Sequence, residues 1–348
     1  RDVVKNERRW SVDNQPYGTW WERLPALCFP SEHPFHHSLI GSMDDLDAAS
    51  LDDVREFFAT YYTPDNAVLT IAGDFDPAEA RRLVEELYGP IPRGAGRPPL
   101  PPMELPPTFG GERREVVPDD VVLSRVMLAF RIPAFGTDGH DDASMLATIL
   151  GTRAGSRLQR SLVRDRQLAS EVGAFTYDLT KGSDLLILDA VARPEVDVAT
   201  LERALVEEVD RVIADGVTQA EVDRARALVE SDLVLAMQRA GDRADQLSRY
   251  ATYFGDPTRI NGQLARVRAV TPARVHALAR ERLGADNRAF LIFVPKEGAT
   301  AGAASAGDAA ERDGARDGAR DGARDGARDA GMNAALATAG ADPAAGEG

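Results

Sequence analysis

The stretch from residue 39 to residue 76 constrains the fold most, because it holds the start and stop signals of a helix and then a run typical of a strand. Ser50 stands three residues before Asp53, the spacing of a capping box at a helix N-terminus. Apolar side chains then recur at helical spacing, at Leu51, Val54, Phe57 and Phe58. The pattern predicts a helix with one apolar face that ends before Pro64.

Residues 67–73 follow with the sequence AVLTIAG, a short apolar run that predicts a buried strand. Asp76 and Pro77 then predict a second helix over residues 77–88, with Asp76 as its cap and Pro77 in its first turn. We expect this helix to point three apolar side chains inward, those of Leu83, Val84 and Leu87.

The rest of the chain divides by composition. Residues 93–112 are rich in proline and glycine without periodicity, which indicates a linker. The next part predicts strands within 113–135, 168–192 and 289–294, and helices over 141–150, 198–213, 219–237, 242–254 and 272–283. The run that begins at Asn66 recurs at Asn287, each time between a helix and an apolar stretch. This echo suggests two copies of one α+β fold.

Charge and composition exclude several classes of protein. The 348 residues carry 56 acidic and 41 basic side chains, a net charge of −15, and no Lys/Arg-rich run, so we expect no nucleic-acid partner. The sequence contains no run of 18 apolar residues, so it predicts no membrane span. Cys28 is the one cysteine, which excludes an internal disulfide, and the sequence indicates no compartment. Residues 298–348 repeat Asp-Gly-Ala-Arg and then run out in Ala and Gly, which predicts disorder.

The pattern S-L-x-D-V, F-F, Y-Y-x-P-x-N-A-x-L-x-I-x-G-D-F-D within residues 50–76 resembles the pitrilysin/insulinase family of zinc metallopeptidases, which includes the mitochondrial processing peptidases. The resemblance runs from about residue 1 to residue 296. It implies two related domains, each with an antiparallel-rich sheet packed against helices. Residues 1–92 would be the C-terminal part of the first domain, 93–112 a linker, 113–297 the second, inactive-type domain, and 298–348 a disordered tail.

Glu7 is the candidate metal ligand, and the resemblance alone implies this role. In the family, a helix with the pattern R-D-V-(apolar)-x-x-E supplies the third zinc ligand downstream of an H-x-x-E-H motif. Residues 1–7 match that helix, but none of the five histidines opens such a motif. Residues 1–9 have the pattern of the middle of a helix, with no capping residue before them. We therefore expect the motif, and with it the catalytic residues, to lie upstream. The alternative is that Glu7 is an ordinary solvated acid.

A second possible metal site is the H-x-x-H-H cluster of His33, His36 and His37, since three imidazoles can bind zinc. Pro34 prevents the helix that would align these side chains on one face, and no glutamate stands where a general base is needed. We therefore favour a packing or capping role for the three histidines.

The second half lacks a pair that active single-chain members of the family carry, an Arg and a Tyr seven residues apart that bind substrate. The resemblance places that pair at Val163 and Ser170, and Arg164 is one position away. It therefore implies a zinc endopeptidase subunit that hydrolyses peptides in an enclosed chamber, with a homologous partner subunit supplying the Arg/Tyr pair. The alternative is a non-catalytic core subunit of the same fold.

Overall fold

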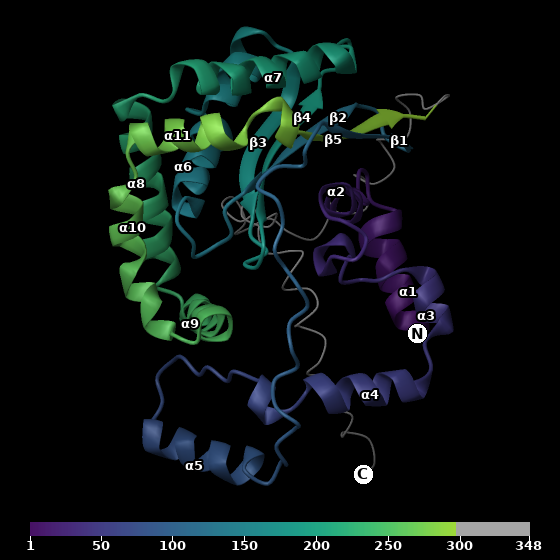
Figure 1. Ribbon diagram of the computed structural model, residues 1–348, viewed down its shortest axis with the longest axis vertical. Coiled ribbons are helices and arrows are strands. Elements are labelled where there is room, and N and C mark those ends of the chain that lie inside the picture. Colours follow the sequence, from purple (N-terminus) through teal and green to yellow (C-terminus); the bar gives the residue numbers. More distant parts are fainter. Residues whose placement is uncertain (297–348) are drawn as a thin grey trace, which may run out of the picture. The chain divides into compact units, whose positions relative to one another are not determined.

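The structure, a computed structural model, describes residues 1–296, and the tail expected to be disordered lies outside them (Figure 1). Its N-terminal part contains α1 (Asp2–Arg8), a π-helical turn (Arg9–Asp13), α2 (Trp20–Cys28), α3 (Met43–Ala48), α4 (Leu51–Tyr61) and α5 (Pro77–Tyr88). The predicted capping box is present, because the Asp53 N–H donates to Ser50 Oγ over 3.2 Å and the Ser50 N–H donates to Asp53 Oδ2 over 2.8 Å. The predicted bounds of α4 and α5 are confirmed.

The prediction of a strand at residues 67–73 is wrong. The chain is extended there, with Ala67 at φ −115° and ψ 149°, yet it pairs with no other strand of residues 1–296. A strand is defined by hydrogen bonds to a neighbouring chain, which an apolar run cannot supply by itself. Leu69 and Ile71 are consequently 58% and 47% exposed, and Leu87 of α5, which we expected to point inward, is 64% exposed.

One five-stranded sheet organises the second part of the chain. It contains β1 (Arg113–Asp119), β2 (Arg125–Ile132), β3 (Ala169–Tyr177), β4 (Asp184–Ala192) and β5 (Ala289–Pro295) in the order β1-β5-β2-β4-β3. Strands β1 and β5 run parallel and the other neighbours antiparallel. All predicted strands of this part are confirmed, and the nearly unbroken apolar sequence of β2 reflects burial of both its faces.

Helices cover both faces of this sheet, as Figure 1 shows. Alternate residues of β2 divide between two cores, with Leu128 facing one and Met127 the other. The first core is formed with α6 (His140–Gly151), α7 (Val198–Asp215), α8 (Gln219–Ala236), α10 (Gln263–Ala269) and α11 (Pro272–Arg282). The second is formed with α2, which precedes the linker in sequence. The α+β class is confirmed, whereas the short α10 was not predicted.

The internal echo has a structural counterpart. A 3-10 turn ends at Asn66 after α4, and another ends at Asn287 after α11. Each asparagine donates from Nδ2 to the carbonyl five residues earlier, Asn66 to Tyr61 over 2.9 Å and Asn287 to Arg282 over 2.6 Å. Asn287 also binds the backbone of Arg131 in β2, because its Oδ1 accepts from the Arg131 N–H over 3.2 Å and its Nδ2 donates to the Arg131 carbonyl over 2.9 Å. The same local motif therefore leads into a sheet at Asn287 and into an unpaired segment at Asn66.

Arg131 ties the linker to the sheet. Its side chain is almost fully buried and donates to the carbonyls of Cys28, Pro106 and Thr108 at 2.6, 3.3 and 3.1 Å. Burial, together with the positive charge of Arg113, lowers the pKa of Arg131 to about 10. The C-terminal end of α2 and the linker are thus held by one guanidinium group on β2.

Candidate functional site

Glu7 lies on α1, and its neighbour Arg8 fixes that helix against α2. Arg8 donates to both carboxylate oxygens of Glu22 at 2.9 and 3.1 Å, a bidentate pair that is largely shielded from solvent. The Glu7 side chain itself is half-buried, and no hydrogen bond or ion pair joins its carboxylate to another of residues 1–296. The carboxylate is therefore available to a ligand, but no histidine of the described chain forms a metal-binding group with it.

The three histidines after α2 have structural roles. His33 is buried against Phe29, accepts from the Phe35 N–H at Nδ1 over 3.2 Å, and lies 3.4 Å through Nε2 from the Met103 carbonyl. His36 Nδ1 lies 2.9 Å from the Phe29 carbonyl, and His37 Nε2 lies 3.1 Å from the Ser31 carbonyl. A ring nitrogen that faces a carbonyl must carry a proton and cannot bind a metal. His33 thus packs and caps as we expected, whereas His36 and His37 each contact one backbone carbonyl.

The two positions aligned with the family's Arg/Tyr pair are also structural. Val163 lies in a π-helical segment (Gln159–Asp165) and packs against the core that contains α6. Ser170 lies on β3 and donates to the carbonyl of Val191 over 3.3 Å. Neither side chain has the charge or the aromatic hydroxyl of the Arg/Tyr pair that the resemblance implies at these positions.

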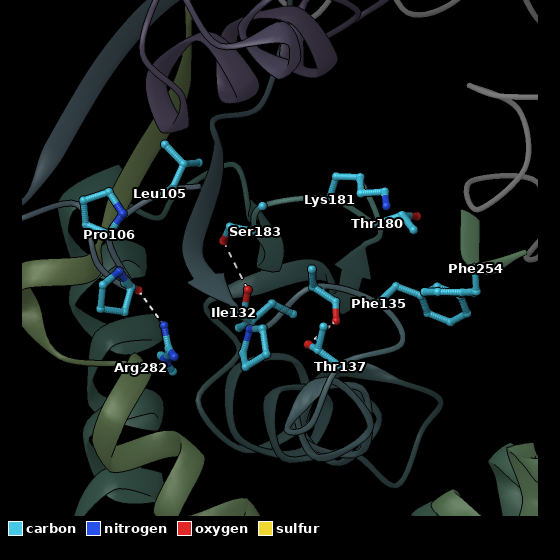
Figure 2. Close-up of a pocket in the computed structure, with 14 residues that line it drawn as sticks. Leu105, Pro106, Ile132, Phe135, Thr137, Thr180, Lys181, Ser183, Phe254 and Arg282 are labelled. Carbon is cyan, nitrogen blue, oxygen red and sulfur yellow. Dashed lines mark hydrogen bonds between the residues drawn. The ribbon is translucent and has the colours of Figure 1, made fainter. Parts of the chain in front are cut away.

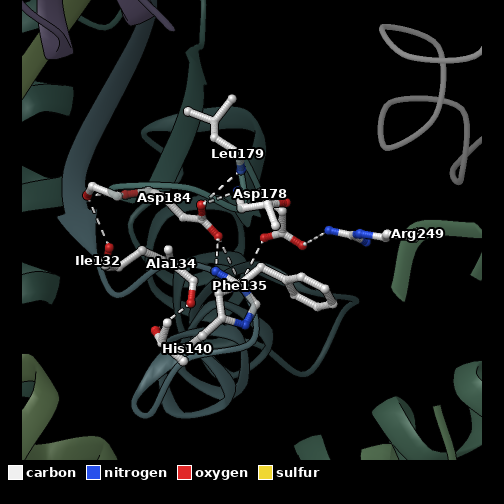
Figure 3. A network of polar contacts seen from close by, with 11 residues as sticks. Ile132, Ala134, Phe135, His140, Asp178, Leu179, Asp184 and Arg249 are labelled. Carbon is white, nitrogen blue, oxygen red and sulfur yellow. Dashed lines mark hydrogen bonds and ion pairs between the residues drawn. The ribbon is translucent and has the colours of Figure 1, made fainter. Parts of the chain in front are cut away.

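A buried polar network lies where β3 and β4 join, and the sequence analysis gave its members no role (Figure 3). His140 Nε2 of α6 lies 3.0 Å from Asp178 Oδ1 and 3.4 Å from Asp184 Oδ2. Arg249 of α9 (Ala240–Phe254) donates to the other oxygen of Asp178 over 3.1 Å. Asp184 accepts from three backbone N–H groups, those of Phe135, Leu179 and Thr180, at 2.7, 2.9 and 2.9 Å.

The electrostatics of this network follow from its burial and its alternating charges. Burial raises the pKa of Asp184 to about 6, and the negative charge of Asp178 adds to the rise. Burial also opposes ionisation of Asp178, but the hydrogen bond from His140 and the charges of His140 and Arg249 outweigh it and lower the Asp178 pKa to about 2. Burial alone would lower the pKa of His140, yet the hydrogen bond and charge of Asp178 raise it.

The network is the one group of three or more metal-ligating side chains among residues 1–296, with ligand atoms within 4.8 Å of one another. Its chemistry does not favour a metal. When both aspartates are ionised and His140 is protonated, they sum with Arg249 to zero charge, and the oxygens of Asp184 are bound by backbone donors. We interpret it as an ion network that holds the turn between β3 and β4. Asp178 and Asp184, on either side of the turn, are the feature of the sequence that could have indicated this network.

Comparison with known proteins identifies the family. A family model described as "Peptidase M16 inactive domain" matches residues 48–229, just over half of the chain. Zinc protease PqqE of Helicobacter pylori is 29% identical over 251 residues, which are 72% of this chain and 56% of that protein. The mitochondrial-processing peptidase subunit beta of Blastocladiella emersonii is 25% identical over 309 residues, 85% of this chain and 64% of that protein. The chain therefore spans about 56–64% of the length of these relatives.

Solved structures agree on the fold. The crystal structure of a protease from Helicobacter pylori has a TM-score of 0.78 and 25% identity, and the match covers 84% of this chain and 71% of that one. Complex III2 from Candida albicans contains a chain with a TM-score of 0.72 and 13% identity, over 84% of this chain and 70% of that one, a likeness of fold alone.

None of the helices formed by residues 1–296 is both long enough and apolar enough to cross a membrane. The matched domain, the mixed α+β fold and the zinc proteases among the relatives all lead to one assignment. The chain belongs to the M16 family of pitrilysin-type zinc peptidases and contains the inactive domain of that family.

Proposed function

We propose that this chain is part of a zinc endopeptidase subunit, to which it contributes the inactive-type domain and one metal ligand, Glu7. The observation that carries the proposal is the match of residues 48–229 to the M16 inactive domain, together with relatives named as zinc proteases. Glu7 supports it, because its carboxylate lacks a partner among residues 1–296 on a helix that Arg8 holds in place.

The described residues do not by themselves fit a catalytic zinc site. Such a site needs three protein ligands, and this chain offers Glu7 without a histidine beside it. Zinc, when bound in a complete site, supplies a Lewis acid and an activated water for attack on a peptide carbonyl. In our proposal the two histidines and the general base come from an H-x-x-E-H motif outside residues 1–348, and this chain's part is to place one carboxylate.

The unpaired segment after Asn66 supports a first domain that continues beyond the described residues. By analogy with Asn287, whose amide binds the neighbouring strand β2, Asn66 marks the entry to a sheet. Val54, Phe57 and Phe58 of α4 are 45–53% exposed, as are Leu69 and Ile71 at 58% and 47%. Apolar surface of this extent requires cover in a soluble protein. Strands outside residues 1–296 would provide it.

A homologous partner subunit completes the proposal, because Val163 and Ser170 cannot bind substrate as the family's Arg and Tyr do. The mitochondrial-processing peptidase subunit among the relatives is named as one subunit of an enzyme. Peptides would then be held between two chains. The second candidate, a non-catalytic core subunit, has one observation in its favour, the fold shared with a chain of complex III2.

Replacing Glu7 by Gln in the longer parent chain tests the proposal. An amide is a poor zinc ligand beside two imidazoles, so we expect zinc content to fall strongly and peptide hydrolysis, assayed with the partner present, to fall by orders of magnitude. Asp2→Asn is the matched control, because Asp2 lies on the same helix and is exposed. Asp13 is less suitable, since it lies 3.6 Å from Arg8.

Two results would contradict the proposal. A Glu7→Gln parent with full zinc and full activity would show that another residue is the third ligand. A parent reading frame without H-x-x-E-H would favour the core-subunit alternative, since no general base or imidazole ligands would then exist.

A further inference from the structure

A cavity of about 420 Å³ opens beside the turn between β3 and β4 (Figure 2). In the view of Figure 2, Leu105, Pro106 and Arg282 lie on one side of it and Thr180, Lys181 and Phe254 on the other. Apolar side chains make up eight of its fourteen lining residues, namely Leu105, Pro106, Pro107, Ile132, Pro133, Ala134, Phe135 and Phe254. The volume suits one or two amino-acid side chains.

The turn that forms one wall is strained. Thr180 is β-branched but has φ +73°, in the left-handed region that such residues rarely adopt. Gly182 has φ +75°, and a Cβ there would lie 2.1 Å from the Met103 carbonyl, so the linker approaches the turn too closely for any side chain. Strain of this kind persists where the surroundings enforce it, and it concentrates at binding sites.

The ion network of His140, Asp178, Asp184 and Arg249 holds the turn in this strained conformation. Asp184 binds the N–H groups of Leu179 and Thr180 at the strained position, and also that of Phe135, whose side chain lines the cavity. Arg249 stacks its guanidinium group 3.9 Å from the centre of the Phe135 ring. Four buried or half-buried charges thus fix two walls of the cavity from behind, which makes it preformed.

The cavity has one uncommitted cation. Within residues 1–296, no hydrogen bond or ion pair engages the Lys181 ammonium group, which lies on the strained turn and lines the cavity. Arg282, on the opposite side, is already occupied, because it donates to the Pro107 carbonyl over 2.9 Å and lies 3.0 Å from Glu281. An anion entering the cavity would therefore meet Lys181, whose neighbour Thr180 also lines the cavity.

We propose that this cavity is a second peptide-binding site, which takes an apolar side chain together with the carboxylate next to it. The apolar side chain contacts the proline and phenylalanine walls, and the carboxylate pairs with Lys181. The carboxylate can be a peptide C-terminus or a neighbouring Asp or Glu. That the ligand is a peptide rests on the proposed function. The site would retain peptides or products without touching the reacting atoms.

Three fluorescein-labelled hexapeptides test the proposal on the full chain by fluorescence anisotropy. The first ends in Leu-Phe with a free carboxylate, the second is its C-terminal amide, and the third is an amide that carries Glu before Phe. We expect the free acid to bind about tenfold more tightly than the plain amide, and the advantage to shrink as salt is raised. Binding of the third probe shows whether an internal carboxylate also serves.

Lys181→Gln should weaken the free acid about tenfold, and Lys181→Arg should restore most of the affinity. Lys296→Gln is the matched control, since it removes the same charge from an exposed position after β5. Phe254→Ala should weaken all three probes. Equal binding of acid and amide, or a Lys181→Gln variant that is folded by circular dichroism and binds like the wild type, would overturn the proposal.

This test separates the pocket from the proposed function, because it measures binding and not hydrolysis. If this chain binds the probes while the longer parent holds no zinc and is inactive, only the peptidase proposal is contradicted. If the parent is active but this chain binds none of the three probes, only the proposed binding site is contradicted.

Discussion

Single buried charges hold the parts of this chain that lack regular secondary structure. Arg131 binds three carbonyls of α2 and the linker, and Asp184 binds three N–H groups around the β3–β4 turn. A buried carbonyl or N–H that loses such a partner costs about 1–3 kcal/mol of stability. Each of these two residues therefore acts on several segments at once.

From the ion network we predict that the free energy of unfolding passes through a maximum as the pH is varied. The pKa of Asp178 is lowered to about 2, so its contribution to the free energy of unfolding is present above the unfolded pKa of about 4 and is lost as pH falls towards 2. The pKa of His140 is raised, so its contribution is full below about 6.5 and is lost as pH rises through the folded value. Asp184, whose pKa is raised to about 6, also makes stability fall as pH rises from about 4 to 6.

Urea denaturation of the chain between pH 3 and 9 measures this. His140→Gln should remove the decline that belongs to His140, above about pH 6.5, and should leave the fall that belongs to Asp184. The acid limb should shrink, because the hydrogen bond and charge of His140 are the main causes of the low pKa of Asp178. His276→Gln is a comparison variant from another part of the fold, where the imidazole binds the Ile213 carbonyl over 2.9 Å. An unchanged pH profile in His140→Gln would mean that the network does not titrate with unfolding.

At the scale of elements, helices α4 and α6 both have apolar residues at helical spacing but have opposite surroundings. Helix α4 has a complete capping box and a regular apolar face, yet none of its residues is buried. Helix α6 has no side-chain cap, yet nine of its residues are buried, and six of these belong to the core over the sheet. Capping and periodicity determine that a helix forms, whereas burial decides how much stability its side chains contribute.

Two phenylalanines test that difference. Phe58 of α4 is 53% exposed and Phe130 of β2 is fully buried. Phe130→Ala should lower the free energy of unfolding of this chain by about 3–5 kcal/mol, and Phe58→Ala by less than about 1 kcal/mol. Urea denaturation measures both. If the two variants lost equal stability, the α4 face would be covered in solution by something beyond the described contacts.

At the scale of the whole molecule, the chain corresponds to a little more than half of a longer type of protein. Its relatives extend beyond it, and most of its exposed large apolar side chains lie in residues 39–91, ahead of the linker. The sheet that contains β1 to β5 is, in contrast, covered on both faces. One of these faces is covered by α2, which precedes the linker, whereas α4, α5 and the segment between them lack a second layer among residues 1–296.

The zinc content of the chain follows from this division. Glu7 alone cannot hold zinc tightly. Both ring nitrogens of His33, and one each of His36 and His37, contact backbone groups. We therefore expect less than one zinc per chain after dialysis, measured by elemental analysis. Stoichiometric zinc that disappears when His33, His36 and His37 are replaced by Ala would contradict our interpretation of that cluster.

The sequence by itself determined what depends on neighbours along the chain. The Ser50–Asp53 box, the Asp76 cap and the asparagine turns at Asn66 and Asn287 are local hydrogen-bond motifs, so their residues predict them. Strands β1 to β5 were predicted for the same reason, since their alternation and β-branched content are local. The family resemblance rested on these local patterns.

Only the tertiary structure decided what depends on distant partners. Residues 67–73 have the same kind of sequence as β5, but β5 finds β1 and β2 beside it and the earlier segment finds no strand among residues 1–296. His140 and Asp184 are 44 residues apart in sequence, and no local pattern joins them before the chain folds. Hydrogen bonds across a sheet and charges that meet in a core belong to pairs of segments, so one segment's residues cannot specify them.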